Sequence, residues 1–282
     1  MTEPEDDFPL RRILVAMDAT SFDIHALDVA ASLAARLSAE LHGLFVEDLD
    51  LLALARLDVV RHISLATGMP ERLDPERMEE ELRSLARQAR RQIQQAAQAR
   101  GIAFSFRVVR GHGASVLAEA AADVDLMVVE TAGRPLLGQV RMTSTWRVLA
   151  RQAPGSVLLL ATGATPSAPV IAVVDGSPGS MRALGAAITL AHRLGGPLTA
   201  VIADHDREAM AKVESDVRAA LARAGMAARI QLLTEDDPDK LLRAVHALGG
   251  GIVVATRSGP LAESECGTRL FDRCAEPLLL TS

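Results

Sequence analysis

Apolar and polar positions along the chain repeat one pattern twice. The first copy begins with an aliphatic run over 13–17 that ends at the carboxylate of Asp18. Apolar residues then recur at spacings of three and four, as on the buried face of a helix, and a second aliphatic run follows. The second copy has the same order from Val170, with its carboxylate at Asp175. Strand, helix and strand without a hairpin turn predict a right-handed parallel βαβ unit in each copy.

The two copies form an internal repeat. A shift of 157 residues places Asp18 on Asp175 and aligns small and aliphatic residues of the two predicted helices, such as Ala30 with Ala187. A chain of 282 residues has room for two domains of about 140 residues, close to the usual domain size. We therefore predict an α/β protein with two tandem doubly wound domains, each a five-stranded parallel sheet.

The other segments set the expected domain boundaries. The segment 47–70 has no counterpart in the second half and fits a helix loosely, so we expect a helical insertion there. Small residues over 162–169 predict a linker between domain 1 (11–161) and domain 2 (170–282), and residues 1–10 are expected to be a disordered tail. Further strands are predicted at 102–109, 125–129, 157–160, 198–203, 228–233, 252–255 and 278–280, and further helices at 76–100, 114–122, 144–151, 180–194, 207–224, 238–248 and 268–274.

Composition narrows the class of partner. The net charge of -6 and the scarcity of aromatic residues argue against a nucleic acid, which is bound through basic surfaces and aromatic stacking. No apolar run reaches the about 18 residues that span a bilayer, and the acidic N-terminus does not resemble a secretion signal. We expect a cytoplasmic protein without membrane contact. Two cysteines, Cys266 and Cys274, are too few for a disulfide framework and are expected to be reduced thiols.

Candidate ligand contacts follow the predicted strands. In an open parallel sheet, ligands bind outside the carboxyl ends of the strands, where successive connections leave to opposite faces. A structural role is the alternative for both aspartates, because a carboxylate after a strand can accept N–H bonds from the next turn. The candidates at this edge are Asp18, Thr20 and Val46 in the first half and Asp175, Ser177 and Ala203 in the second.

The chain from Arg12 onward resembles the universal stress protein family, in particular its tandem two-domain members. The resemblance is carried by ILVAMDAT and VIAVVDGS with the helices that follow them, by RVVRGHGASVLAEAA, and by the fourth strand with its loop and helix. It implies five parallel strands per domain, in an adenine nucleotide alpha hydrolase-like fold. In one branch of the family it also implies an ATP site with a G-x-x-G-(nine residues)-G-[S/T] loop after strand four, whose glycines and helix start approach the phosphates.

Both loops depart from that pattern. Aligning Val129 with Val254 reduces the offset between the halves to 125. In that frame, Glu130 and Ala255 replace the first glycine, and the second loop has eight residues in place of nine. The loop residues that remain candidates for phosphate binding are Gly133, Thr143 and Ser144 in the first half and Gly267 and Thr268 in the second.

Glu130 is the more severe replacement, because a carboxylate there would face a triphosphate. Two charges about 4 Å apart interact by about 4 kcal/mol at an effective dielectric near 20. Since about 1.4 kcal/mol is a tenfold change in affinity, uncompensated repulsion would turn micromolar binding into millimolar. Arg134, Arg141 or Arg257 could offset it, or Glu130 could point away.

Two functions follow. The first is a non-enzymatic stress-response protein that binds ATP, another adenine nucleotide or a related small molecule. The alternative is an interaction or scaffold protein of the same fold that has lost nucleotide binding and docks an unknown protein partner. The sequence contains no P-loop, serine elbow or metal-binding histidine pair that would indicate an enzyme or a metal site. The side chains of residues 204–206 are adjacent in sequence and are therefore poorly placed to bind one ion. The family's use of the last strand implies an intramolecular pseudo-dimer, with a homodimer as a further option.

Overall fold

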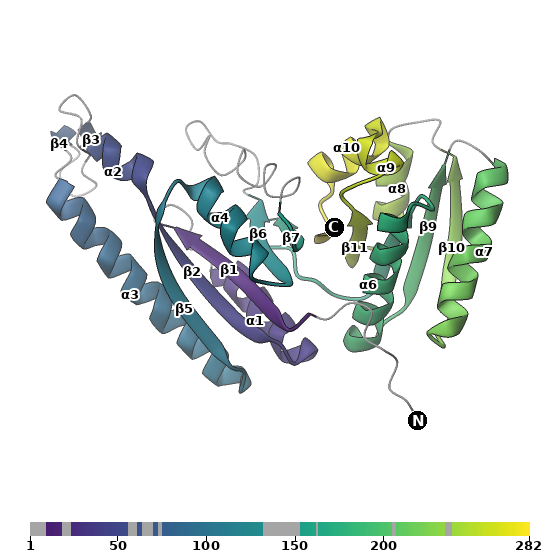
Figure 1. Ribbon diagram of the computed structural model, residues 1–282, viewed down its shortest axis with the longest axis horizontal. Coiled ribbons are helices and arrows are strands. Elements are labelled where there is room, and N and C mark those ends of the chain that lie inside the picture. Colours follow the sequence, from purple (N-terminus) through teal and green to yellow (C-terminus); the bar gives the residue numbers. More distant parts are fainter. Residues whose placement is uncertain are drawn as a thin grey trace.

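The structure of the protein is a computed structural model that describes residues 10–18, 24–55, 61–63, 70–72, 75–131, 153–161, 163–204, 207–234 and 239–282. Strands and helices alternate along both halves of the chain, and Figure 1 shows the halves side by side with the linker between them. The first half contains β1 (Arg12–Asp18), α1 (Ile24–Leu37), β2 (Glu40–Asp48), α2 (Leu49–Ala55), β3 (Arg61–Ile63), β4 (Pro70–Arg72), α3 (Pro75–Arg100), β5 (Phe104–Gly111), α4 (Gly113–Ala122), β6 (Leu126–Thr131) and β7 (Ser156–Ala161).

The second half repeats this order without an equivalent of α2, β3 and β4. The predicted strand over 170–174 agrees with β8, whereas the last predicted helix begins three residues earlier than expected and follows a short helix that starts at Pro260. The elements are β8 (Val170–Val174), α6 (Pro178–Leu194), β9 (Leu198–Asp204), α7 (Arg207–Arg223), β10 (Ala228–Thr234), α8 (Lys240–Ala247), β11 (Ile252–Thr256), α9 (Pro260–Glu263), α10 (Glu265–Arg273) and β12 (Leu278–Thr281).

Ten strands form one sheet in the order β10-β9-β8-β11-β12-β7-β6-β1-β2-β5. Within each half the neighbouring strands are parallel, whereas β7 and β12 pair antiparallel, with Leu159 opposite Leu278. Counted outward from this pair, both halves show the same strand order, so the α/β fold class with two five-stranded parallel halves is confirmed. The helical segment predicted at 144–151 and residues 1–9 of the tail predicted at 1–10 lie outside the described residues. Leu10, expected in the tail, is instead buried in the core.

Two apolar layers cover the sheet. One layer joins the sheet to α1, α3, α6 and α7, and includes Ala30, Ile93 and Leu184. The other joins it to α4, α8, α9 and α10. Small residues in α1 and α6, such as the fully buried Ala30 and Ala187, let these helices lie close to the sheet, in agreement with a core that contains few aromatic residues.

Strand register corrects the alignment of the two halves. Val15 pairs with Val128 across β1 and β6, and the equivalent Ala172 pairs with Val254 across β8 and β11. The offset at the fourth strand is therefore 126 (254 minus 128), and the predicted value of 125 is wrong by one residue. Glu130 consequently corresponds to Thr256 rather than to Ala255.

The segment 47–70 contains more than a helix. The structure describes α2 at its start, followed by the short antiparallel pair β3 and β4, in which Arg61 lies opposite Arg72. Helix α3 then returns along β2 and β5 and buries Leu82, Ala89 and Ile93. This segment therefore lies at the carboxyl end of β2, next to the predicted ligand edge of the first half.

Candidate functional site

A switch in connection faces occurs between β8 and β11. These strands are neighbours, but β8 continues into α6 on one face of the sheet and β11 continues into α9 and α10 on the other. Such a point leaves a crevice outside the carboxyl ends of the two strands. Asp175 follows β8 directly and the loop from Arg257 follows β11, so both reach this crevice.

The carboxylate of Asp175 spans the crevice. Its Oδ1 accepts the backbone N–H of Ser177 at 2.9 Å, and its Oδ2 accepts the backbone N–H of Leu261, also at 2.9 Å. We call these two contacts the Asp175 bridge. Burial alone would raise the pKa of Asp175, but hydrogen bonds from Ser177, Leu261 and Ser180 outweigh it and lower the pKa below its ordinary value of 3.8. Asp175 is therefore an anion that holds the two loops together.

The start of α6 explains why Asp175 is so placed. Gly176 has φ +80°, and a Cβ on it would lie 2.4 Å from Cγ2 of Val213 in α7. Glycine is therefore favoured in the turn between β8 and α6. Ser177 then caps α6 by accepting the N–H of Ser180 at 3.2 Å. The motif after β8 is thus a turn and helix cap, as the structural alternative for Asp175 predicts.

The loop after β11 uses its N–H groups within the chain. Leu261 N donates to Asp175, and Gly267 N donates to Ser264 Oγ at 3.1 Å. Because a phosphate binds such a loop through free N–H groups, the donors named in this paragraph are not available to one in this conformation. The other internal donors are Arg257 N to Thr281 O, Ser258 N to Thr256 Oγ1, Glu263 N to Gly259 O, Ser264 N to Leu261 O and Thr268 N to Ser264 O.

Two glycines of this loop have different roles. Gly259 has φ +102°, and a Cβ on it would lie 3.0 Å from Ser177 Oγ, so the loop lies directly against the start of α6. A Cβ on Gly267 would lie 2.0 Å from the carbonyl oxygen of Leu261, so this glycine allows α9 and α10 to pack. In the corrected register the frame is Thr256-x-x-Gly259, seven residues, Gly267-Thr268. The alignment made from the sequence did not identify Gly259 as a residue of this motif. Its positive φ in the structure identifies it.

Of the other predicted residues in this half, Ala203 lies near the end of β9 and is buried. Strand β9 is the neighbour of β8, so Ala203, Asp175 and Ser177 share one edge of the sheet. Thr268 is in α10, where its N–H closes a helical turn. Asp175 and Ser177 therefore meet the loop after β11 at Leu261 and Gly259. Gly267 packs against Leu261, and Ala203 lies on the neighbouring strand.

In the first half the structure describes part of the predicted site. Val46 is buried in β2 and pairs with Asp18 at the end of β1, so both backbones reach the ligand edge. The side chain of Asp18 and the residues Thr20, Gly133, Thr143 and Ser144 lie outside the described residues.

Ion pairs surround the carboxyl ends of β2 and β5. The buried Glu47 accepts a hydrogen bond from the guanidinium of Arg110 at 2.9 Å. The exposed His112 lies 3.2 Å from the carboxylate of Asp50. His112 thus has an acidic neighbour at the protein surface, which fits the solvated role that is usual for a loop histidine.

A serine, a histidine and a glutamate meet at the opposite edge of the sheet. Ser105 Oγ lies 3.0 Å from His42 Nδ1, and His42 Nε2 lies 3.3 Å from Glu40 Oε2. The second contact is not aligned as a hydrogen bond, since His42 Nε2 has no hydrogen-bond partner in the described structure. These residues start β2 and β5, far along the strands from the crevice, so they are not part of the candidate site.

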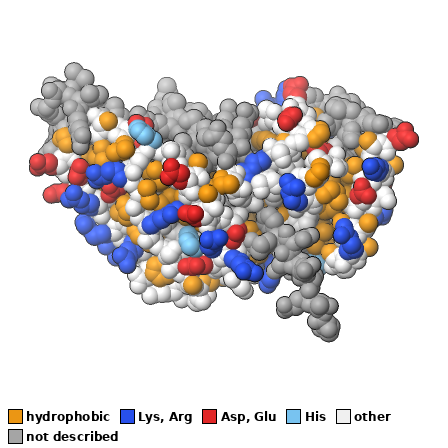
Figure 2. Space-filling view, in the orientation of Figure 1, with side chains coloured by type: hydrophobic (Ala, Val, Ile, Leu, Met, Phe, Trp, Pro, Cys, Tyr) orange, Lys and Arg blue, Asp and Glu red, His pale blue; other side chains and the backbone are white. Residues whose placement is uncertain are grey.

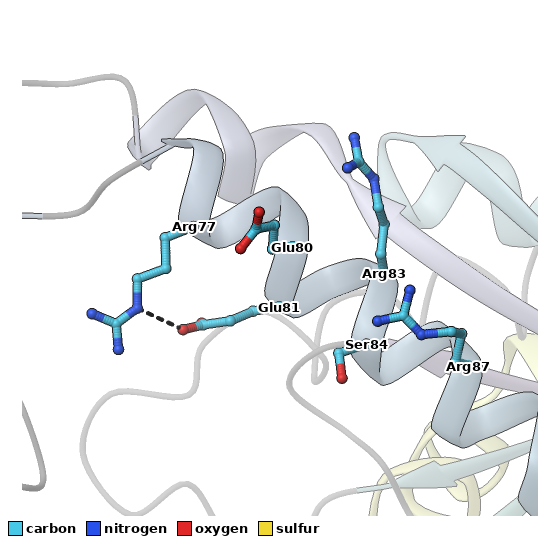
Figure 3. A pocket seen from close by; sticks show the side chains of 6 residues that line it. All are labelled: Arg77, Glu80, Glu81, Arg83, Ser84 and Arg87. Carbon is cyan, nitrogen blue, oxygen red and sulfur yellow. Dashed lines mark hydrogen bonds and ion pairs between the residues drawn. The ribbon is translucent and has the colours of Figure 1, made fainter.

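The hollow along α3 is made of charged side chains. About 540 Å³ in volume, it is lined by Arg77, Glu80, Glu81, Arg83, Ser84 and Arg87. Figure 3 shows these side chains projecting from one helix, with Arg77 paired to Glu81 at 3.2 Å. Figure 2 shows acidic and basic side chains interspersed over the visible face of the molecule. None of the described lining residues is apolar, whereas small-molecule sites are lined mostly by apolar side chains. This hollow therefore lacks the features of a small-molecule site.

Neither a metal cluster nor a membrane span is found in the described part of the chain. No group of three or more His, Cys, Asp or Glu side chains there could hold a metal ion, and residues 205–206 of the Asp-His-Asp sequence at 204–206 are outside it. Likewise, no helix among the described residues is both long enough and apolar enough to cross a membrane.

Neither of the two cysteines forms a disulfide. Cys266 is buried, and Cys274 donates to Glu276 Oε2 at 3.3 Å. Burial and the neighbouring carboxylate raise the pKa of Cys274 to about 12. Because the thiolate is the reactive form, Cys274 is expected to react with iodoacetamide on the order of a thousandfold more slowly than free cysteine at pH 8.

Alkylation followed by peptide mass spectrometry measures that rate. Glu276→Gln removes the charge that opposes the thiolate, so the variant should react faster than the parent while the native fold is retained. Alkylation of the parent at the rate of a free thiol would contradict this account of Cys274.

The sheet, its switch point and the turn after β8 define a doubly wound α/β protein. The model of the universal stress protein family matches residues 9–161, more than half of the chain. The chain belongs to the universal stress protein family. No curated protein matches it significantly.

Solved structures show the same fold over the whole chain. A universal stress protein from Archaeoglobus fulgidus DSM 4304 is 14% identical with a TM-score of 0.73, and the match covers 98% of this chain and 97% of that one. A protein of unknown function from Pseudomonas aeruginosa PAO1 is 19% identical with a TM-score of 0.61, covering 99% of this chain and 94% of that one. At these identities the likeness establishes the fold alone.

Proposed function

We propose that this chain is a non-enzymatic universal stress protein that binds an adenine nucleotide or a related small molecule at its strand-end crevices, through loops that depart from the family's ATP motif. The residues proposed to line the two crevices are Asp18, Thr20, Val46, Gly133, Thr143, Ser144, Asp175, Ser177, Ala203, Gly267 and Thr268.

The observation that supports this proposal is the convergence at the second switch point. Asp175 and the loop after β11 are far apart in sequence, yet they leave the same end of the sheet side by side, because β8 and β11 are parallel neighbours. The geometry that carries a nucleotide in doubly wound sheets is therefore retained in outline, even though the loop residues have changed. No metal is part of the proposal.

The alternative function, a scaffold that has lost its ligand, is favoured by the Asp175 bridge itself. In the second half Asp175 accepts the N–H of Leu261, and further N–H groups of the loop bond within the loop, so these donors are already used by the chain itself. The pairing of β7 with β12 supports an intramolecular pseudo-dimer, with tandem domains at 11–161 and 170–282, whose outer surfaces would then be available to a protein partner.

A thermal-shift measurement separates the two functions. The chain is heated with adenosine, AMP, ADP or ATP, each with and without Mg²⁺, and with Mg²⁺ alone as the control. A ligand present at about one hundred times its dissociation constant should stabilise the protein by about 2.7 kcal/mol, which is readily measured. The proposal predicts a shift with at least one adenine compound, whereas no shift with any of them would contradict it and favour the scaffold.

A further inference from the structure

The corrected register identifies the position that Glu130 occupies. Its equivalent in the second half, Thr256, is buried and lies at the crevice, where its Oγ1 accepts the N–H of Ser258 at 3.3 Å. A Cβ on Gly179, in the first turn of α6, would lie 2.6 Å from that Oγ1. The side chain at this position therefore faces the start of the helix that follows the first strand of its half.

Glu130 has the same orientation in the first half. It pairs with Leu160 of β7, and together with Leu126 and Val128 it follows the alternation that directs side chains to the α1 face of the sheet. It is the last residue but one of β6, directly beside the carboxyl end of β1. The carboxylate therefore lies on the α1 face beside the carboxyl end of β1, where the first-half crevice is proposed, and does not point to the opposite face.

Within the described structure, one oxygen of Glu130 has no hydrogen-bond partner. Glu130 Oε1 is buried and accepts no hydrogen bond from any residue that the structure describes. A buried acceptor without a donor is unfavourable, and such groups are rare in native proteins unless a ligand or water completes them. A ligand that donates a hydrogen bond, such as an amine or a hydroxyl, would complete Glu130, whereas a phosphate has no proton to donate when fully ionised and is repelled.

The second half disfavours phosphate for a different reason. Leu261 N, at the start of the loop, already donates to the ionised Asp175, and Gly267 N donates to Ser264. To bind the Leu261 N–H, a phosphate would have to displace the carboxylate of Asp175. The first half thus has a carboxylate, Glu130, in place of the first glycine of the family's ATP motif. In the second half, Thr256 takes that place and the N–H groups of Leu261 and Gly267 are used within the chain.

We propose that the first-half crevice selects its ligand by an uncharged hydrogen-bond-donating group, so that it takes a nucleoside in preference to a nucleoside triphosphate, and that Glu130 makes this selection. The inference rests on the proposed function and specifies the ligand class of the same site. The exocyclic amine of adenine and the hydroxyls of ribose are donors of the required kind.

Isothermal titration calorimetry with adenosine and with ATP tests the inference on the full chain. Adenosine should bind the parent protein at least about tenfold more tightly than ATP, since one close charge repulsion exceeds that factor. Glu130→Gln keeps the shape and one acceptor but removes the charge, so ATP affinity should rise by about tenfold or more while adenosine affinity changes less. Glu130→Thr, which introduces the residue found at the equivalent position Thr256, should weaken the binding of adenosine. Glu119→Gln in α4 is the control, because Glu119 is an exposed glutamate on a helix that covers the face of the sheet opposite to the α1 face, and it should change neither affinity.

The outcomes are distinct for the two claims. ATP binding to the parent as tightly as adenosine, or an ATP affinity that Glu130→Gln leaves unchanged, would overturn the selection by Glu130 and leave the proposed function standing. Absence of binding by every adenine compound, to the parent and to the variants, would overturn the proposed function and this inference with it.

Discussion

Gly267→Ala is expected to destabilise the second half strongly. A Cβ at this position would lie 2.0 Å from the carbonyl oxygen of Leu261 and 3.0 Å from Ala262 Cα, and both are backbone atoms that cannot rotate away. The added Cβ would push α9 away from α10. This should lower the free energy of unfolding by about 3 kcal/mol, the upper end of the range for substitutions that overfill a packed core. The loop glycine is then a packing residue, whatever its relation to a ligand.

Urea denaturation followed by circular dichroism measures this loss. Gly185→Ala in α6 is the matched control, because nothing lies within 4 Å of the added Cβ and the residue is helical. It should stabilise the protein by about 0.5–1 kcal/mol, the usual gain when alanine replaces a helical glycine. Equal stabilities of Gly267→Ala and the parent would show that α9 and α10 are not packed as described.

Asp175→Ala is expected to have the second large effect. The substitution removes the acceptor of two N–H groups, Ser177 N and Leu261 N, and hydrogen bonds to a charged group contribute about 1.5–3 kcal/mol each. Partial access of water to the crevice reduces the sum, so we expect a loss of about 3 kcal/mol at pH 7. The serine cap of α6 remains in the variant, since Ser177 Oγ still accepts the N–H of Ser180.

The effect of Asp175 should depend on pH in a defined direction. The pKa of Asp175 is lowered in the folded protein, so the ionised group stabilises the fold fully above its ordinary value of 3.8, and this stabilisation is lost as the pH falls through the lower, folded value. The difference in stability between the parent and Asp175→Asn should therefore be constant near neutral pH and should decrease below about pH 4. A difference that grows on acidification would contradict the hydrogen-bonded, ionised state.

Much of the fold follows from the sequence because the repeat is carried by buried residues. The aliphatic runs ending at Asp18 and Asp175, with the small-residue helices after them, predict β1, α1, β8 and α6 closely. The error at the fourth strand has a physical cause: β6 and β11 are buried on both faces, so their runs lack the alternation that fixes register. A shift of one residue cannot be detected there, and it concealed both Gly259 and the equivalence of Glu130 with Thr256.

The site was harder to predict than the fold because its contacts are non-local. The sequence indicates that Asp175 could accept an N–H from the turn that follows it, and Ser177 N does donate to it. The partner on the other side, Leu261, has no sequence signal of its own, because any residue at that position offers the same N–H. The unsatisfied oxygen of Glu130 likewise depends on three-dimensional packing.

The amide of Leu261 reports most directly on the central claim, which is that an internal carboxylate takes the loop N–H that a phosphate would need. Hydrogen exchange of this amide, followed by NMR, is predicted to be slow in the parent and at least about tenfold faster in Asp175→Asn, with Ser264 N as an internal reference that does not change. Equal exchange rates for the Leu261 amide in the two proteins would contradict the claim.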